Sequence, residues 1–467
     1  MAKINKSNNK NNLSYDKLKL DKKYLPRIQN TKELSSAIFL KDISKNINKE
    51  IAINGWVYNK RSSGKITFLL IRDGTSDIQA VIEKSKVTKS TWENAEELNI
   101  ESSIQIKGIP KKDKRSPFGY ELDTKELKVI QLACEYPISK KTHGPDFLLD
   151  NRHLWLRSQR QRALLKIRDE VIYSIITYLR NEGFTRVDTP IFQPVSCEDT
   201  TDLFEVDYFG NKIYLTQSGQ LYCEACEFAL GRTYDFGPVF RAEKSKTRKH
   251  LIEFWMMDAE LPFTDLEGLM DFEENMIKHI ITNCLSNTTR ELKILKRDIK
   301  LLENIIKSRF ERIEHKKIID ILKNRYGSKL TYFDDIGADE EASLAQEFDK
   351  PIFITDWPAK IKAFYMPRFK DKNIERVKAV DLMASEGFGE LCGGAEREFD
   401  YNKLLQVLKE KNYPYEYYKW YMDLRKYGSI PHSGFGIGIE RTVRWISGIK
   451  HIRETIPFPR MLNRYKP

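Results

Sequence analysis

One charged segment between two apolar segments constrains the fold most: residues 236–260, FGPVFRAEKSKTRKHLIEFWMMDAE. The alternating, aromatic-rich flanks predict two antiparallel strands, and the charged middle predicts the loop that joins them. We expect Arg241 on the first strand, followed by a second cationic cluster. A guanidinium can bind a phosphate through two parallel hydrogen bonds, so this hairpin suits an extended polyanion such as ATP. A salt-bridged surface hairpin explains the segment equally well.

Size and composition predict a folded protein with a large core. The chain has 467 residues, of which 40% are hydrophobic, and this length allows two to four domains. The net charge of +12 favours a polyanionic partner. No apolar run is long enough to cross a membrane, and the N-terminus lacks the apolar core of a secretory signal. We therefore expect a cytoplasmic protein.

The six cysteines are few for this length, which favours free thiols in a reducing compartment. Cys223 and Cys226 form a CxxC, but no second CxxC or nearby histidine pair completes a tetrahedral zinc site. We expect no metal or redox role for them.

The pattern along the chain predicts four parts. Residues 1–35 are rich in Lys and Asn, and we expect a disordered tail. Residues 36–135 contain short alternating runs separated by Gly, Ser, Asp and Pro, which resemble a small closed barrel of about five strands. Residues 136–150, with their prolines and glycine, predict a linker. Residues 151–467 predict an α+β domain with an antiparallel sheet and flanking helices, two of them expected within residues 266–323.

Three segments of the second domain are similar to the three signature motifs of class II aminoacyl-tRNA synthetases. They are GFTRVDTPIF at 183–192, FGPVFRAE…HLIEF at 236–254 and GFGIGIERTVRW at 434–445, in the family's order. The preceding barrel resembles the anticodon-binding OB-fold of the Asp/Asn/Lys subgroup. The sequence contains neither class I signature, HxGH or KMSKS, and no GxxxxGK[ST] phosphate loop. The resemblance implies ATP-dependent activation of an amino acid and its transfer to a tRNA.

The resemblance also assigns residues to the nucleotide. It implies that Arg241 bridges the α-phosphate and the substrate carboxylate, and that Arg241, Glu390 and Arg441 are catalytic. Asp381 and Glu390 are expected to hold Mg²⁺, which prefers oxygen ligands. The residues expected to bind ATP are Arg241, Glu243, Arg248, Lys249, His250, Leu251, Glu390, Gly436, Gly438, Glu440 and Arg441.

One position departs from the family pattern. The family usually has an arginine directly before the histidine of the second motif, whereas this chain has Lys249 there and Arg248 one residue earlier. Lysine is a point charge without the guanidinium fork. Either residue is therefore a candidate for the outer phosphates.

The amino-acid pocket must separate asparagine from aspartate. In QSGQLYCEA, Cys223 stands where aspartate enzymes of the family carry a lysine, and Glu224 follows it. A Glu224 carboxylate can accept a hydrogen bond from a side-chain amide and would repel a second carboxylate. Arg397 can donate to the amide oxygen. The residues expected to bind the amino acid are Glu198, Ser218, Gln220, Glu224, Arg241, Gly393 and Arg397.

These features favour L-asparagine and tRNA(Asn) as substrates. Three alternatives stay open: an aspartate enzyme, which includes a nondiscriminating form, a synthetase-derived asparagine synthetase, and a catalytically inactive paralogue. For Glu224 itself, the alternative is a solvated helix residue that faces away from the pocket.

The barrel is expected to bind the anticodon through Arg61, Lys65, Phe68 and Gln79. Phe68 could stack on an unpaired base, and Gln79 could read the edge of a uracil. Arg61 and Lys65 are expected in the adjacent loop, where they could hold phosphates. Ordinary alternatives are a core position for Phe68 and a solvated position for Arg61.

The first motif implies a homodimer. In the family, its helix and strand form a two-fold interface, and Pro190 would lie near the symmetry axis.

Overall fold

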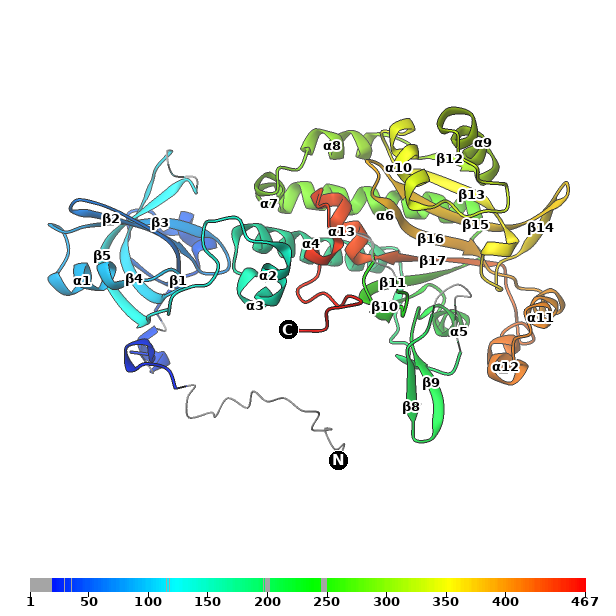
Figure 1. Cartoon of the computed structure of the whole chain (residues 1–467), viewed down its shortest axis with the longest axis horizontal. Coiled ribbons are helices and arrows are strands. Elements are labelled where there is room, and N and C mark those ends of the chain that lie inside the picture. The colour runs from blue at the N-terminus through cyan, green and yellow to red at the C-terminus, as the bar shows by residue number, and fades with distance from the viewer. Residues whose placement is uncertain are drawn as a thin grey trace. The chain divides into compact units, whose positions relative to one another are not determined.

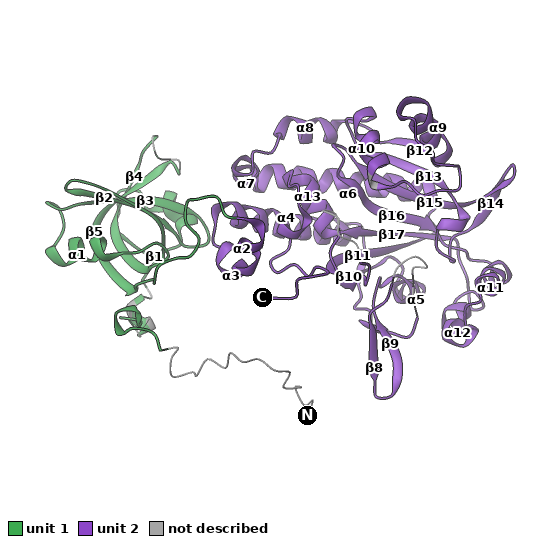
Figure 2. Ribbon diagram, in the orientation of Figure 1, with its two compact units in different colours: residues 1–143 green, residues 144–467 purple. Residues whose placement is uncertain are grey.

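The computed structural model describes residues 19–28, 30–34, 36–114, 116, 118–195, 197, 202–244 and 250–467. The chain divides into two compact units, residues 1–143 and 144–467 (Figure 2). The division falls within the segment for which the sequence predicts a linker. Each unit has a core of its own and is described by itself.

The described part of the first unit forms a closed barrel with the strand order β1-β2-β3-β5-β4 (Figure 1). The parallel pairing of β3 with β5 closes it, and the other pairs are antiparallel. The expected five-stranded barrel is confirmed. Alternate residues of each strand point inward, as in Leu69 and Ile71, because a strand has a period of two. The elements are β1 (Ile51–Ser63), β2 (Ile66–Arg72), β3 (Asp77–Glu83), α1 (Lys89–Glu97), β4 (Ser103–Lys112) and β5 (Tyr120–Gln131), after short 3₁₀ turns at Lys22–Tyr24, Thr31–Leu34 and Leu40–Asn46.

The second unit is built on a large, mostly antiparallel sheet, as the sequence predicts. Its order in the described chain is β12-β13-β15-β16-β17-β11-β10-β6, with β14 paired to β15. A small sheet, β7-β9-β8, stands apart. The strands are β6 (Thr185–Arg186), β7 (Phe192–Gln193), β8 (Glu205–Tyr208), β9 (Asn211–Leu215), β10 (Thr233–Phe240), β11 (Glu253–Pro262), β12 (Glu311–Glu314), β13 (Ile352–Pro358), β14 (Arg368–Asp371), β15 (Ile374–Ala384), β16 (Gly389–Glu396) and β17 (His432–Gly438).

Helices cover this sheet and close its main core. The long helix α4 starts at Ser158, whose side chain accepts a hydrogen bond from the Gln161 amide, and ends before Gly183, which has a φ of 82°. Its apolar face packs with α6 and α13 in the largest cluster of buried residues. The helices are α2 (Pro145–Asp150), α3 (Arg152–Trp155), α4 (Gln159–Asn181), α5 (Gln220–Leu230), α6 (Leu266–Asn287), α7 (Thr289–Ile294), α8 (Ile299–Lys307), α9 (His315–Tyr326), α10 (Ala338–Glu347), α11 (Tyr401–Glu410), α12 (Tyr415–Asp423) and α13 (Ile439–Ser447), with 3₁₀ turns at Ala359–Ile361 and Ile452–Glu454.

Residues 266–323 differ from the two expected helices. They form α6, α7, α8 and most of α9, and the short strand β12 lies before α9. The side chain of Asp298 accepts a hydrogen bond from the Leu301 amide, which starts α8 as a separate helix. Strand β12 adds to the edge of the sheet by parallel pairing with β13, a tertiary contact that local helix propensity does not reveal. Every described helix is too short or too polar to cross a lipid bilayer.

Candidate active site

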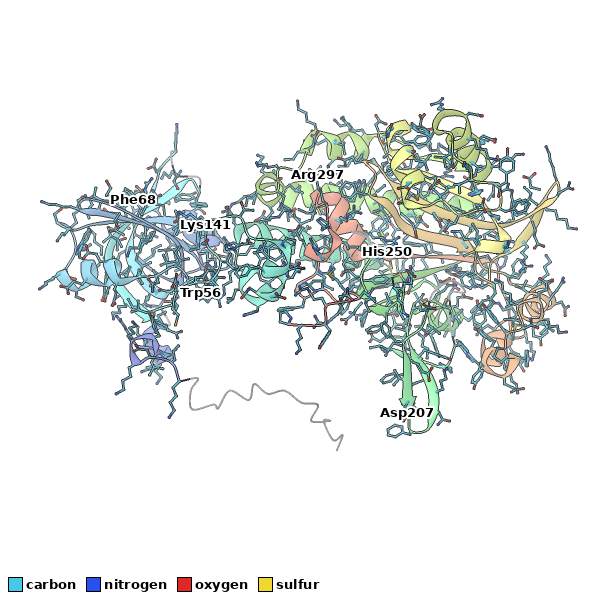
Figure 3. All side chains as sticks on the ribbon, viewed as in Figure 1. Trp56, Phe68, Lys141, Asp207, His250 and Arg297 are labelled. Atoms are coloured by element: carbon cyan, nitrogen blue, oxygen red, sulfur yellow. The ribbon has the colours of Figure 1, made fainter. Side chains whose placement is uncertain are left out.

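A cavity of about 450 Å³ opens in the second unit beside β10, β11, β16, β17 and α13. It brings together most of the residues expected to bind ATP, which come from segments up to 200 positions apart: Arg241, Glu243, His250, Leu251, Glu390, Gly436, Gly438, Glu440 and Arg441. His250 is labelled in Figure 3. Three expected site residues, Glu198, Arg248 and Lys249, lie outside the described residues.

Arg241 directly follows β10, where the loop that joins β10 to β11 begins. Its backbone amide donates to the Ile252 carbonyl at 2.9 Å, which continues the ladder by one residue and aims the side chain into the cavity. The guanidinium lies 5.4 Å from the centre of the Phe254 ring. Its buried Nε has no hydrogen-bond partner among the described residues. A buried, unpaired donor is costly, so this position suits an anionic ligand.

Arg441 and Glu390 both line the cavity and contact each other. Arg441 Nη1 donates to Glu390 Oε2 at 3.0 Å and to the Glu390 carbonyl at 3.3 Å. Glu440 also lines the cavity, but its carboxylate ties α13 to neighbouring elements. It accepts from the Trp255 amide at 3.0 Å and pairs with Arg168 at 2.7 Å. Glu440 is therefore occupied by protein groups.

The alternating glycines of β17 leave room for carboxylates on β11. Gly434 is the cross-strand partner of Glu260, and Gly436 is the partner of Asp258. A Cβ atom on Gly436 would lie 2.6 Å from Asp258 Oδ1, and one on Gly434 would lie 2.3 Å from the Glu260 carboxylate. Any other residue would clash there, so GFGIG shapes the pocket floor.

The two carboxylates expected to hold Mg²⁺ border the same glycine. A Cβ atom on Gly393 would lie 3.3 Å from Asp381 Oδ1 and 3.4 Å from Glu390 Oε1. Lys362 Nζ donates to Asp381 at 2.6 and 2.9 Å, and Arg441 pairs with Glu390 at 3.0 Å. Carboxylate oxygens are the ligands that a hard cation prefers, and a cation here would compete with Lys362 and Arg441 for them.

Burial and neighbouring charges set the pKa values of this pair. Burial raises the pKa of Asp381 to about 7, although Lys362 opposes the shift. Burial would also raise the pKa of Glu390, but Arg441, Lys362 and Arg241 together lower it below the ordinary value. Glu390 is therefore the more readily ionised of the two.

The start of α5, where two of the residues expected to bind the amino acid lie, is held by Asp258 on β11. Ser218 Oγ and the Gly219 amide donate to Asp258 Oδ2 at 3.0 and 2.8 Å, and the Gln220 amide donates to Ser218 Oγ at 3.1 Å. Across three strands, Gly393 pairs with Gly436, which pairs with Asp258. This register places residues that are expected to bind the amino acid beside residues that are expected to bind ATP.

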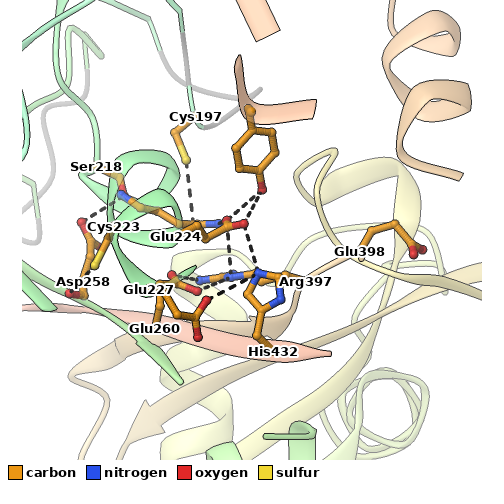
Figure 4. Close-up of polar contacts among 12 residues, drawn as sticks. Cys197, Ser218, Cys223, Glu224, Glu227, Asp258, Glu260, Arg397, Glu398 and His432 are labelled. Atoms are coloured by element: carbon orange, nitrogen blue, oxygen red, sulfur yellow. Dashed lines mark hydrogen bonds and ion pairs between the residues drawn. The ribbon is translucent and has the colours of Figure 1, made fainter. Parts of the chain in front are cut away.

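Glu224 is fully buried on α5, so it is not a solvated residue that faces away (Figure 4). Arg425 Nη2 and the Tyr421 hydroxyl each donate to its carboxylate at 2.8 Å, and His432 Nε2 lies 3.2 Å from Oε2. Burial would raise the pKa of Glu224, but Arg425, His432 and Arg397 lower it below the ordinary value. Glu224 is thus held as an anion inside the protein.

Arg397 lies between two carboxylates. Its Nε and Nη2 donate to Glu260 at 3.0 and 2.7 Å, and its Nε is 3.9 Å from Glu224 Oε1. The described residues also contain one close group of possible metal ligands, Glu224, Glu260 and His432. Arg397 and Arg425 already neutralise its carboxylates, so this group does not fit a cation.

Sequence reasoning missed several residues of this site: Asp258, Glu260, Lys362, Tyr421, Arg425 and His432. A polar residue at an inward position of a strand, as in the alternating EFWMMDAEL, is the signal that could have revealed Asp258 and Glu260. Arg425 has no such signal, because the charged segment around it is typical of a solvated surface.

Three of the expected anticodon residues lie on the adjacent barrel strands β1, β2 and β3: Arg61, Phe68 and Gln79. Arg61 is on β1 and not in the loop, so that expectation is wrong. It is the cross-strand partner of Phe68, and its guanidinium lies 4.7 Å from the centre of the half-buried Phe68 ring (Figure 3). Pleated strands bring direct partners together on one face. Gln79 Nε2 donates to Glu121 at 2.7 Å, and Lys65 lies in the turn between β1 and β2.

Pro190 lies exposed between β6 and β7. Strand β6 is at the end of the large sheet, and both of its residues are exposed. Its neighbour Thr189 donates to Asp235 on β10, which fixes the segment against the sheet.

Two family models match the chain. Residues 144–462 match tRNA synthetases class II (D, K and N), and residues 51–130 match the OB-fold nucleic acid binding domain. The asparagine–tRNA ligase of Desulforamulus reducens is 49% identical over 429 residues, which are 92% of this chain and 99% of that protein. The asparagine–tRNA ligase of Streptococcus mutans is 48% identical over 440 residues, with 91% and 98% covered.

Solved structures agree with these relatives. The crystal structure of asparaginyl-tRNA synthetase from Pyrococcus horikoshii, complexed with asparaginyl-adenylate, is 39% identical with a TM-score of 0.87. The comparison covers 92% of this chain and 99% of that one. The Entamoeba histolytica asparaginyl-tRNA synthetase, also with asparaginyl-adenylate, is 30% identical with a TM-score of 0.82 and the same coverage.

Proposed function

The chain belongs to the class II aminoacyl-tRNA synthetases of the Asp, Lys and Asn group, and we propose that it joins L-asparagine to tRNA(Asn). The buried, ionised Glu224 beside Arg397 carries this proposal, since the pair offers one acceptor and one donor to a side-chain amide. The asparagine–tRNA ligases that match nearly the whole chain agree with it. Residues 151–467 would perform the catalysis and residues 36–135 would bind the anticodon.

The reaction has two steps. The asparagine carboxylate attacks the α-phosphorus of ATP, which forms asparaginyl-adenylate and releases pyrophosphate. A ribose hydroxyl at the 3′ end of the tRNA then attacks the acyl carbon and releases AMP. The protein's contribution to the first step is to position the two reactants and to stabilise the charge that builds on phosphorus.

Arg241 would hold the attacking carboxylate and the α-phosphate together, because it lines the cavity and its Nε has no partner among the described residues. Arg441, anchored by Glu390, would bind the far end of the nucleotide. Glu243 and the groups around His250 would contact the base and the outer phosphates, with either Arg248 or Lys249 among them. Each role is a proposal from the family resemblance and the shared cavity.

Asp381 and Glu390 would hold a Mg²⁺ ion, whose charge would neutralise the phosphates of bound ATP. The two carboxylates border the same glycine, Gly393, and such an ion would compete with Lys362 for Asp381.

Discrimination against aspartate would follow from charge. An aspartate side chain about 4 Å from ionised Glu224 would be repelled by roughly 4 kcal/mol at an effective dielectric constant of about 20. That energy corresponds to about a thousandfold, and unpaired hydrogen-bonding groups would add to it. No separate editing site is then needed.

The barrel would read the tRNA anticodon. Phe68 could stack on the middle base, with Arg61 already packed against its ring. Gln79, held by Glu121, could read a uracil edge. Both the Asn and Asp tRNAs are expected to carry U there, so this contact would not separate them.

We further propose a homodimer formed through the exposed edge strand β6 and the segment around Pro190, since an unpaired strand edge can pair with a second copy. A translation enzyme of this kind would act in the cytoplasm.

Pyrophosphate exchange and product analysis test the function. The purified enzyme should exchange pyrophosphate into ATP with asparagine far better than with aspartate, and should form asparaginyl-tRNA. Equal exchange with aspartate would favour a nondiscriminating aspartate enzyme, and free asparagine as the product would favour an asparagine synthetase. A monomeric mass at micromolar concentration would contradict the dimer.

A further inference from the structure

Glu224, the residue proposed to accept from the substrate side chain, is on α5, but the groups that hold it come from the segment that ends α12 and leads into β17. Arg425 Nη2 donates to Glu224 Oε2 at 2.8 Å, and neither side chain is exposed. The Tyr421 hydroxyl lies 2.8 Å from each oxygen of the same carboxylate. More than 190 residues separate Glu224 from both partners, so only the tertiary fold joins them.

Arg425 is itself fixed in place. Its Nε donates to the Glu398 carbonyl at 2.9 Å, and its guanidinium lies 4.3 Å from the centre of the Tyr421 ring. Helix α12 is anchored to α5 by a cluster of buried apolar residues that includes Leu221, Tyr421 and Met422. These contacts leave the guanidinium little freedom to move away from Glu224.

The position differs from that of a purely structural ion pair. Arg425 Nη1 is buried and has no hydrogen-bond partner among the described residues. A buried donor without a partner is unfavourable. A spare donor next to the proposed side-chain acceptor is expected where a ligand completes the site.

We propose that Arg425, supported by Tyr421, is a positioning residue that keeps Glu224 ionised and aligned, so that the pocket selects an amide side chain over a carboxylate. The inference rests on the proposed function and deepens it. An ionised Glu224 accepts hydrogen bonds and repels aspartate. A neutral Glu224 carries an O–H that can donate to an aspartate carboxylate, so the loss of Arg425 would weaken discrimination.

The other groups around Glu224 do not replace Arg425. Burial acts against ionisation, and the nearby Glu227 adds no negative charge because burial raises its pKa to about 10. Arg397 is committed to Glu260. The groups that face Glu224 are Gln220 and Glu227 on α5, Glu260 on β11, Arg397 after β16, Tyr421 on α12, Arg425 after it, and His432 on β17.

The direction of the pH effect follows from these groups. Arg425 is the largest influence that lowers the pKa of Glu224 against burial. Without it, Glu224 would take up a proton at a higher pH than in the wild type. Aspartate should then become a better substrate as the pH falls, while the wild type keeps its preference over the same range.

The test compares kcat/KM for asparagine and aspartate in pyrophosphate exchange, from pH 6 to pH 8, in the full-length enzyme. In Arg425→Met the asparagine preference should fall about tenfold or more and should fall further at low pH. Arg425→Lys keeps the positive charge and should restore most of the preference. Lys426→Met removes the same charge from the next, exposed position, where Lys426 pairs with Asp423, and should leave the preference unchanged.

Tyr421→Phe is a second test in case Arg425→Met does not fold. It removes one hydroxyl and keeps the ring. It should lower the asparagine preference by a smaller factor, with thermal unfolding and the KM for ATP close to the wild type. A folded Arg425→Met with the wild-type preference at every pH would overturn the inference. If that variant does not fold, an unchanged preference in Tyr421→Phe would overturn it. A wild type without any preference for asparagine would instead contradict the proposed function.

Discussion

Arg397 forms a two-pronged ion pair with Glu260, its Nε and Nη2 lying 3.0 and 2.7 Å from the two carboxylate oxygens. Both side chains are buried. The guanidinium proposed to contact the substrate side chain is therefore oriented before any substrate arrives. Preorganisation of this kind lowers the cost of binding, because little side-chain freedom remains to be lost.

Glu260→Gln should raise the KM for asparagine by about tenfold or more, since the amide keeps the shape but loses the charge that holds Arg397. The KM for ATP should change little. Glu396→Gln serves as the control. Glu396 is on β16 directly before Arg397, and the substitution removes its pair with the exposed Lys378. Steady-state pyrophosphate exchange measures both constants, and an unchanged asparagine KM would show that Glu260 does not position Arg397.

Arg241→Lys should lower kcat/KM for pyrophosphate exchange by about a hundredfold or more. Lysine keeps the charge but lacks the fork that can hold a carboxylate and a phosphate at once. Arg232→Lys, an exposed arginine that pairs with Glu182, is the matched control and should retain activity. Exchange in Arg241→Lys at the wild-type rate would remove Arg241 from the catalytic residues.

Phe68→Ala should raise the KM for tRNA by roughly tenfold to a hundredfold, because stacking contributes about 1–3 kcal/mol per base. Pyrophosphate exchange, measured without tRNA, should be unaffected. Phe39→Ala removes another aromatic side chain of the first unit, 58% exposed, and should leave the tRNA KM unchanged. A normal tRNA KM in Phe68→Ala would place the anticodon elsewhere.

His315 should make the second unit sensitive to acid. Burial lowers the pKa of His315 to about 4, although a hydrogen bond with the Asp334 carbonyl opposes the shift. An unfolded chain binds this proton near pH 6.5, so stability is complete above that pH and declines as the pH falls toward 4. The loss should approach about 3 kcal/mol.

Denaturant unfolding of the wild type and of His315→Gln, at several pH values from 7 to 4, tests this sign. As the pH falls, the free energy of unfolding should decrease more for the wild type than for the variant. A difference that stays constant with pH would contradict the buried, neutral histidine. His143→Gln, at a half-buried position of the chain, serves as the control variant.

Much of the nucleotide site could be predicted from the sequence because its residues lie in local patterns. The strands around Arg241 are rich in apolar and aromatic residues, and the glycines of GFGIG precede a helix with Arg441 on its first turn. Patterns of this kind depend on the backbone period of a single element. The barrel could also be predicted, since its apolar-alternating strands are separated by turn residues.

The position of Arg61 could not be predicted from the sequence around it. The basic segment around it predicts a loop, whereas the structure extends β1 through Ser63 and pairs Arg61 with Phe68. The end of a strand is decided by its partner across the sheet, and the sequence of one strand does not carry that information.

The sequence by itself determined the two domains, the antiparallel sheet and the segments that surround the nucleotide cavity. Only the tertiary structure decided how charge is balanced around Glu224 and Arg397. Glu224 and Arg425 are 201 positions apart, and Arg397 and Glu260 are 137 apart. A buried charge is tolerated only with a partner, and which partner it finds depends on the packing of whole elements and not on the neighbouring sequence.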